Sequence, residues 1–436
     1  MTKVAVTVYA GGLVFQQVFG IKELWGIDFF WIAAIGLVVL TALYTIFGGM
    51  KSVLYTSVLQ TPILLLGSLI ILVLGFKELG GWDEMMRVCG AVTVNDYGDT
   101  MTNLIRSNDD ANFPWLGALI GSAIIGFWYW CTDQFIVQRV LSGKNEKEAR
   151  RGTIFGAYLK LLPVFLFLIP GMIAFALHQK YIGAGGEGFL PMLANGTANA
   201  DAAFPTLVAK LLPAGVKGLV VCGILAALMS SLASLFNSSA MLFTIDFYKR
   251  FRPETPEKKL VGIGQIATVV IVILGILWIP IMRSVGDVLY TYLQDVQSVL
   301  APGIAAAFLL GICWKRTSAQ GGMWGLIAGM IIGLTRLGAK VYYSNAGEVA
   351  DSTFKYLFYD MNWLFFCGWM FLFCIIVVIV VSLATEAPTA EKIQGLVFGT
   401  ATKEQKAATR ASWDHWDIIH TVIILAITGA FYWYFW

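Results

Sequence analysis

Long apolar runs separated by short polar turns dominate the chain. At 1.5 Å per residue, a helix of roughly 20 residues crosses a hydrocarbon core of about 30 Å. Lipid offers the backbone no hydrogen-bond partners and the runs lack the alternation of barrel strands, so helices are expected. The pattern predicts an all-α polytopic membrane protein. About eleven spans are expected, namely 4–20, 28–47, 53–75, 113–132, 153–177, 214–244, 260–282, 288–312, 321–343, 361–384 and 417–436.

Positive charges in the turns predict how the helices are oriented. Residues 139–151 and 249–259 each hold five Lys or Arg, and 384–416 holds four, whereas the turns between them hold fewer. Basic turns stay on the cytoplasmic side of a membrane. We therefore expect the first residues inside and the C-terminus outside. A plasma membrane is predicted, and the short 384–416 segment favours a bacterial inner membrane.

Composition excludes several classes of protein. The chain is 58% hydrophobic and 13% charged, which is too apolar for a soluble protein and predicts the lipid bilayer as its main partner. A net charge of +3 gives no reason to expect nucleic acid. The cysteines form no CxxC pair and the histidines no HExxH spacing, so neither a metal centre nor an enzyme is expected.

Polar side chains inside the predicted spans are the first functional candidates, because burying them in a membrane is costly. Lys160 lies about eight residues, or roughly 12 Å, from the cytoplasmic end of its span. The alternative for Lys160 is a side chain that extends back to the interface. Gln294, Asp295 and Gln297 lie at a similar depth from the opposite side and predict a water-lined cavity. Transporters place their substrate near this depth.

An aromatic stretch, Trp128, Tyr129 and Trp130, precedes the polar residues Thr132 and Asp133. The stretch fits an aromatic belt at the membrane interface. It equally fits a sugar site, because an aromatic ring stacks on the C–H face of a sugar while neighbouring polar groups bond its hydroxyls.

The stretch "ILAALMSSLASLFNSS" at 224–239 places hydroxyls in an apolar span. Ser230, Ser234 and Ser238 share one helical face, and Ser231 lies beside the first. Packing of helices through small residues explains the pattern without a ligand. The alternative is a site for a dehydrated cation, with the Ser230 and Ser231 hydroxyls and the Ala227 carbonyl as ligands. Spacing alone does not choose between them.

Several of these segments resemble one transporter family. The segments "WYWCTDQFIVQR", "YLKLLP", "ALMSSLASLFNSSAMLFTIDFY", "AAAFLLGICWKR" and "LTALYTIFGGMKSVLYTSVLQT" are similar to the sodium/glucose cotransporters of the sodium:solute symporter family. The resemblance runs over nearly the whole chain. It implies a fourteen-helix fold with a five-plus-five inverted repeat, of which this chain would lack the first three helices. The expected division is 4–75 for the rest of the first repeat, 113–312 for the second, and 321–436 for peripheral helices.

The resemblance implies a sodium site on the serine-rich segment. Ala227, Ser230 and Ser231 match the half of the site that the second repeat supplies. Members that carry two sodium ions have Thr after the serine pair and Asp in a "YTD" motif, where this chain has Ala233 and Ser57. One sodium per sugar is therefore predicted.

The resemblance also implies a sugar site. Lys160 and Gln294 match residues that bond sugar hydroxyls, Tyr129 matches an inner gate that stacks on the ring, and Trp130 is its neighbour. Gly126 replaces an Asn or Thr that faces the sugar, which removes one contact.

The resemblance predicts a sodium-coupled symporter that imports a monosaccharide such as glucose or galactose by alternating access. Three alternatives are open: a symporter for inositol, an amino acid or sialic acid, a non-transporting sugar sensor, and, least of all, a membrane enzyme. The acidic segment 76–112 is expected to be an outer lid or a solvated linker. Nothing in the sequence predicts the oligomeric state.

Overall fold

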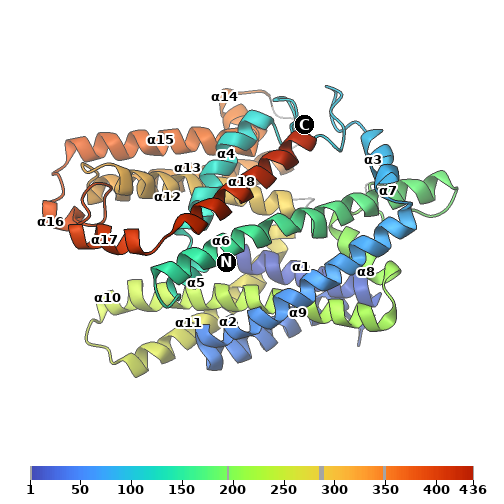
Figure 1. Ribbon diagram of the computed structural model, residues 1–436, viewed down its shortest axis with the longest axis horizontal. Coiled ribbons are helices and arrows are strands. Elements are labelled where there is room, and N and C mark those ends of the chain that lie inside the picture. The colour runs from blue at the N-terminus through green and yellow to red at the C-terminus, as the bar shows by residue number, and fades with distance from the viewer. Residues whose placement is uncertain (1, 194–195, 284–288, 347–349, 436) are drawn as a thin grey trace. The chain divides into compact units, whose positions relative to one another are not determined.

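The structure, a computed structural model, describes residues 2–193, 196–283, 289–346 and 350–435 (Figure 1). It comprises two compact units, each treated by itself below. Unit one contains Met1–Thr93, Thr100–Thr102 and Leu159–Leu289, and unit two contains Val94–Asp99, Asn103–Tyr158 and Tyr290–Trp436. Within the described residues the only strands are the short antiparallel pair β1 (Glu23–Leu24) and β2 (Ile27–Asp28).

Unit one is helical apart from this strand pair. Its helices are α1 (Thr2–Phe19), α2 (Phe29–Leu79), α3 (Trp82–Gly90), the end of α6 (Glu146–Pro163), η2 (Val164–Leu168), α7 (Ile169–Gly183), η3 (Ala200–Ala202), α8 (Ala203–Leu211), α9 (Ala214–Met241), η4 (Leu242–Tyr248), α10 (Lys249–Phe251) and α11 (Glu257–Arg283).

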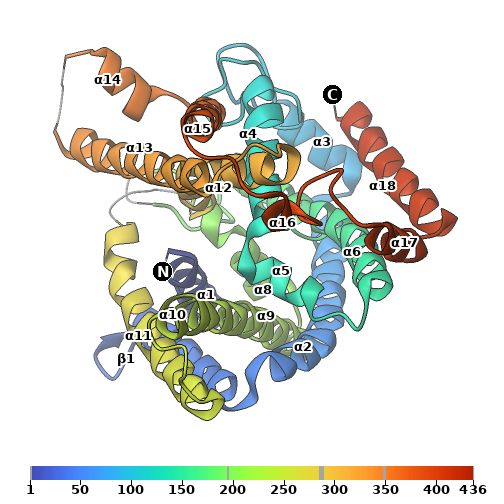
Figure 2. The same cartoon turned by 90° about the vertical axis from the view of Figure 1, so that its left-hand side faces the viewer.

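Helix α1 lies in the core of unit one, where α2, α8, α9 and α11 pack against it. Figure 2 shows α1 beside α9 and α11. Val4, Ala5 and Val8 of α1 are at most 2% exposed. A Cβ added to Gly275 of α11 would lie 2.5 Å from Val4 Cγ1, so this glycine is needed for the close approach of the two helices.

Unit two holds the remaining helices. They are α4 (Trp115–Phe127), η1 (Trp128–Thr132), α5 (Gln134–Leu141), most of α6, α12 (Leu289–Cys313), α13 (Ala319–Asn345), α14 (Thr353–Lys355), η5 (Tyr356–Asp360), α15 (Trp363–Ala384), α16 (Ala390–Ile393), α17 (Lys403–Ala411) and α18 (His415–Tyr434).

Glycines bring α12, α13 and α15 close together in unit two (Figure 1). A Cβ on Gly329 of α13 would lie 3.0 Å from the Cα of Gly303 on α12, and one on Gly333 would lie 2.6 Å from Val299 Cγ1. Small residues allow such backbone contact between membrane helices. The portion of α6 that belongs to unit two contacts α18, where Tyr158 Oη lies 3.0 Å from His420 Nδ1.

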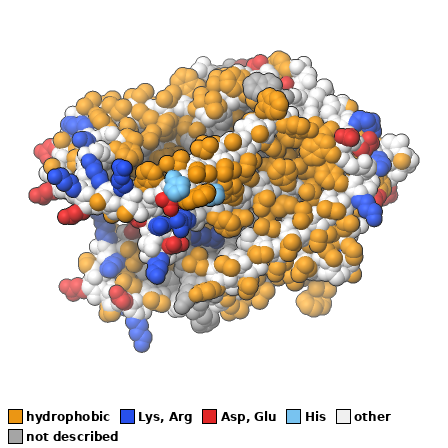
Figure 3. Space-filling model, in the orientation of Figure 1, with side chains coloured by type: hydrophobic (Ala, Val, Ile, Leu, Met, Phe, Trp, Pro, Cys, Tyr) orange, Lys and Arg blue, Asp and Glu red, His pale blue; other side chains and the backbone are white. Residues whose placement is uncertain are grey.

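The predicted spans all overlap helices. Ten helical stretches among the described residues are long and apolar enough to cross a membrane. Segment 4–20 is helical as α1 but is not one of the ten. One helix, α2, covers both 28–47 and 53–75 and carries two of the spans. In Figure 3, hydrophobic side chains cover most of the surface that is drawn, and charged side chains gather in separate clusters.

The acidic segment 76–112 has more structure than a solvated linker. It includes α3 and, in unit two, a hydrogen-bonded turn in which Asn95 Nδ2 donates to Asp99 at 2.7 Å and to Asp110 at 3.2 Å. Burial by itself raises the pKa of the Asp110 carboxyl, but the amides of Phe113 and Asn112 donate hydrogen bonds to it and, with Asn95 and Arg106, leave the pKa lowered. The signal for this order is the Asn and Asp content of the segment, which favours such turns.

Candidate functional site

The serine-rich stretch lies on α9, and its polar face meets α2 within unit one. Ser230 is 7% exposed, and its Oγ lies 2.5 Å from Ser57 Oγ of α2. Ala227 and Ser231 are half-buried. Because residues three and four apart share a helix face, Ala227, Ser230 and Ser231 lie within one turn on the same side of α9.

Two other serines of α9 bond to the helix itself. Ser234 Oγ donates to the carbonyl of Ser230 at 3.0 Å, and Ser238 Oγ donates to the carbonyl of Leu235 at 3.1 Å. Both side chains are at most 4% exposed. Bonds of this kind allow hydroxyls inside an apolar span without a partner from another helix. Ser238 therefore needs no ligand to explain it.

The close contact of α2 with α9 depends on small residues. A Cβ on Gly67 of α2 would lie 2.6 Å from Val220 Cγ2, and one on Gly223 of α9 would lie 3.2 Å from Ile63 Cγ2. Tyr44 of α2 also donates to the carbonyl of Met229 at 2.8 Å. Together these contacts hold the Ser57 hydroxyl against Ser230.

The chemistry available here is that of neutral oxygen ligands. Hydroxyl and carbonyl oxygens suit hard cations. Ser57 adds a further hydroxyl to this place and no negative charge. A cation that loses its hydration shell would need more oxygen ligands than one turn of α9 provides, so a second element must complete any such site.

The aromatic stretch of unit two lies where a membrane helix changes geometry. Helix α4 leads into the π turn η1, which contains Trp128, Tyr129 and Trp130. Trp128 is buried, Tyr129 is half-buried and Trp130 is 48% exposed. The Tyr129 and Trp130 rings are 5.1 Å apart and nearly perpendicular. Pi turns are rare and often occur at functional sites.

Gly126 precedes this turn and faces open space. A Cβ added there would meet no heavy atom within 4 Å. A larger polar side chain would therefore fit at this position, so the glycine is not required by packing.

Gln294 is half-buried on α12, next to Asp295. The Asp295 carboxylate accepts a hydrogen bond from Lys340 Nζ of α13 at 2.5 Å and lies 3.8 Å from Arg336 Nη2. Asp295 is 8% exposed. This ion pair explains the buried Asp295 carboxylate without a ligand. The sequence pattern predicts a water-lined cavity here and does not predict the ion pair.

Arg336 is fully buried among contacts from η5 and α15. Its Nη2 donates to the carbonyl of Met361 at 2.8 Å, and its guanidinium lies 4.0 Å from the centre of the Phe366 ring. Its Nε and Asp295 Oδ1 are buried with no hydrogen-bond partner among the described residues. Sequence reasoning missed Arg336 and Lys340. Their signal was available, because two cations four residues apart in an apolar span are costly unless paired.

Lys160 is exposed near the end of α6, in the part of that helix that belongs to unit one. Tyr129, Trp130, Gly126 and Gln294 belong to unit two. The predicted sugar-binding set is thus divided between the two units, and its assembly stays a prediction.

A family model described as "Sodium:solute symporter family" matches residues 1–329 of the 436. This chain belongs to the sodium:solute symporter family. That family consists of transporters, not enzymes. The match confirms the resemblance that the sequence motifs predicted.

Relatives within the sodium:solute symporter family are similar along most of this chain. A sodium/mannose cotransporter of Bos taurus is 34% identical, with 100% of this chain and 75% of the relative covered. The sodium/myo-inositol cotransporter 2 of Homo sapiens is 35% identical, with 92% of this chain and 60% of the relative covered. The sodium/glucose cotransporter 4 of Mus musculus is 34% identical, with 92% of this chain and 59% of the relative covered. The chain thus spans three fifths to three quarters of the length of these relatives.

A solved structure confirms the fold of this symporter-family chain. The substrate-bound, outward-open state of a Na+-coupled sialic acid symporter matches with a TM-score of 0.63 at 21% identity. The match covers 89% of this chain and 74% of the other. An all-helical, multi-pass transporter fold is therefore shown.

Proposed function

We propose that the protein is a sodium-coupled symporter that imports a small polyhydroxy solute, a monosaccharide such as glucose or galactose, by alternating access. The family match over residues 1–329 carries this proposal. Sodium and sugar would shift the same conformational equilibrium, so that binding of one favours binding of the other. The membrane is the plasma membrane, with a bacterial inner membrane expected from the charge pattern.

Sodium is the co-transported ion in this proposal. The Ala227 carbonyl and the Ser230 and Ser231 hydroxyls supply part of its shell, supported by their place on one turn of α9. Ser57 and Ala233 stand where two-sodium members carry Asp and Thr, so one sodium accompanies each sugar. A charge-to-solute flux ratio near two would contradict this stoichiometry.

The solute site combines Tyr129, Trp130, Lys160 and Gln294. The aromatic ring of Tyr129 stacks on the solute, while Lys160 and Gln294 bond its hydroxyls. Gly126 leaves space where a contact is lost, which makes inositol or another small solute the second candidate. The relatives named for mannose, myo-inositol and glucose support the polyhydroxy class and leave its member open.

Uptake into proteoliposomes tests the proposal directly. The native protein that contains this chain would be reconstituted, and labelled glucose, galactose, mannose and myo-inositol offered with an inward sodium gradient. Uptake of at least one solute, abolished when potassium replaces sodium, is expected. Sodium currents without solute accumulation would instead indicate a sensor.

Two variants connect the residues to the function. Ser230→Ala removes a proposed sodium ligand and should raise the sodium concentration for half-maximal uptake at least about tenfold. Ser234→Ala, on the same helix, is the matched control and should leave it within about twofold. Lys160→Ala should lower the apparent affinity for solute if Lys160 bonds the sugar, and should change little if its ammonium only reaches the membrane interface.

A further inference from the structure

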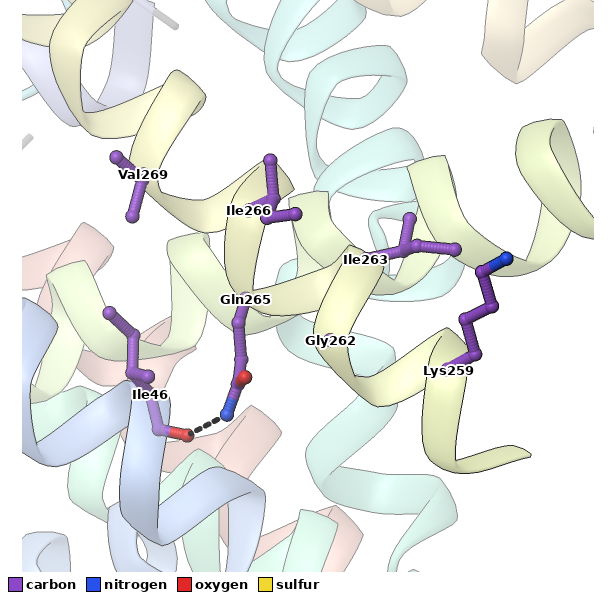
Figure 4. Close-up of a pocket in the computed structure, with 7 residues that line it drawn as sticks. All are labelled: Ile46, Lys259, Gly262, Ile263, Gln265, Ile266 and Val269. Atoms are coloured by element: carbon purple, nitrogen blue, oxygen red, sulfur yellow. Dashed lines mark hydrogen bonds between the residues drawn. The ribbon is translucent and has the colours of Figure 1, made fainter. Parts of the chain in front are cut away.

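A groove on unit one is bounded by α11 and by α2. It has a volume of about 540 Å³. A smaller cavity of about 270 Å³ shares Ile46 and Gln265 with it and extends it toward α9 and η4. The groove is lined by Ile46, Lys259, Gly262, Ile263, Gln265, Ile266 and Val269 (Figure 4).

The groove follows one face of α11. Residues 259, 262, 263, 266 and 269 recur at the spacing that keeps side chains on the same side of a helix. Figure 4 shows Lys259 at one end of this row and Val269 at the other. Ten residues of helix separate them, which corresponds to about 15 Å. That length equals about half of a hydrocarbon core, or one leaflet.

The walls of the groove are apolar and exposed. Ile266 is 66% exposed and Val269 is 45% exposed, although both lie in a candidate membrane span. Gly262 adds depth, because a Cβ there would meet nothing within 4 Å. Gln265 Nε2 donates to the carbonyl of Ile46 at 3.3 Å, which links the two walls.

One end of the groove is positively charged. Lys259 lies in the first turn of α11, at the end of the segment 249–259, which has five cations against two carboxylates. In the described part of the chain, no carboxylate forms an ion pair with any of these five. The charge is therefore available to an anion at the membrane interface.

We propose that this groove binds an anionic phospholipid of the cytoplasmic leaflet. One acyl chain lies along Ile263, Ile266 and Val269, and the headgroup phosphate meets Lys259. An apolar groove of leaflet length that ends in a cation matches the two parts of such a lipid. Basic pockets between membrane helices on the cytoplasmic side recognise anionic headgroups in this way. The inference does not depend on the proposed transport function.

The test counts lipids retained by the purified full-length protein in detergent, using native mass spectrometry. The probes are 1-palmitoyl-2-oleoyl phosphatidylglycerol and the phosphatidylcholine with the same acyl chains. Tighter retention of phosphatidylglycerol is expected. Lys259→Ala should weaken it about fivefold, since a Lys near the surface contributes on the order of 1 kcal/mol. Lys259→Arg keeps the positive charge and should retain phosphatidylglycerol as the native protein does. Lys258→Ala removes a neighbouring cation that does not line the groove, and it should change retention less than twofold.

Filling the groove tests the acyl-chain part of the proposal. Gly262→Trp should reduce retention of both lipids. If thermal melting shows that this variant does not fold, Ile266→Trp takes its place. Equal loss from Lys259→Ala and Lys258→Ala would overturn the proposal in favour of diffuse attraction. Equal retention of the two lipids in the native protein, or no effect of either Trp variant, would also overturn it. Each readout is independent of transport, so failure here leaves the proposed function untouched.

Discussion

Helix α9 and the helix pair α12 and α13 carry polar side chains inside membrane spans. The two regions provide hydrogen-bond partners for these side chains in different ways. On α9 the groups are hydroxyls, and Ser234 and Ser238 bond to carbonyls of their own helix. On α12 and α13 the groups are charged, and Asp295 pairs with Lys340 across the helix interface. The bond of Ser238 is local to one helix, whereas the ion pair needs two helices in register.

The difference has a consequence for stability. Removing a hydroxyl that bonds to its own helix leaves that carbonyl with its ordinary helical partner, so little is lost. Removing one member of a buried ion pair leaves an uncompensated charge, and the loss is large. Polar residues that look equally costly in the sequence therefore differ widely in how much they contribute to the free energy of unfolding.

The largest effect is expected from Asp295→Ala. This change leaves Lys340 and the fully buried Arg336 without their carboxylate, and should lower the free energy of unfolding by about 3–5 kcal/mol. Thermal unfolding in detergent would measure it. Asp351→Ala is the matched control, because Asp351 also pairs with a Lys but is 96% exposed. Similar midpoints for the two variants would contradict the distinction drawn here.

A double-mutant cycle isolates the pair itself. Asp295→Leu and Lys340→Met together should destabilise the protein by less than the sum of the single changes, because the double variant leaves only Arg336, and not Lys340, without its carboxylate. A coupling energy of about 1–3 kcal/mol is expected from unfolding measurements on all four proteins. Strict additivity would mean that the 2.5 Å contact contributes nothing.

Gly67→Ala tests the packing of α2 against α9. The new methyl group would lie 2.6 Å from Val220 Cγ2, and overpacking of this kind costs about 1–3 kcal/mol. Gly218→Ala on α9, where a Cβ meets nothing within 4 Å, should not destabilise the protein. The same unfolding assay compares them, and an unchanged Gly67→Ala variant would show that the interface is loose.

The smallest effect is expected from Ser238→Ala, whose hydroxyl donates to the Leu235 carbonyl of its own helix. The carbonyl that loses this hydrogen bond keeps its helical N–H partner. The free energy of unfolding should therefore fall by less than about 1 kcal/mol. A loss above about 2 kcal/mol would show that the Ser238 hydroxyl contacts more than its own helix. Chemical denaturation resolves a difference of this size.

The spans were predictable because hydrophobic length is a strong signal, as α11 and α15 illustrate. The serine face of α9 and the polar run at Gln294 were also visible as costly groups in lipid. The pairing of Asp295 with Lys340 was not, because a separation of 45 residues gives no register between α12 and α13. The contact of Ser57 with Ser230 spans 173 residues and depends on glycines whose partners only the fold reveals.

The π turns η1, η2, η4 and η5 have a consequence for comparing this chain with its relatives. Each holds one residue more than an α turn would, so deleting a single residue there could restore a regular helix. After η2 and η4, where the helix continues, such a deletion would rotate the following helix by about 100° relative to the preceding part. Single-residue gaps in an alignment are therefore best placed in these four turns.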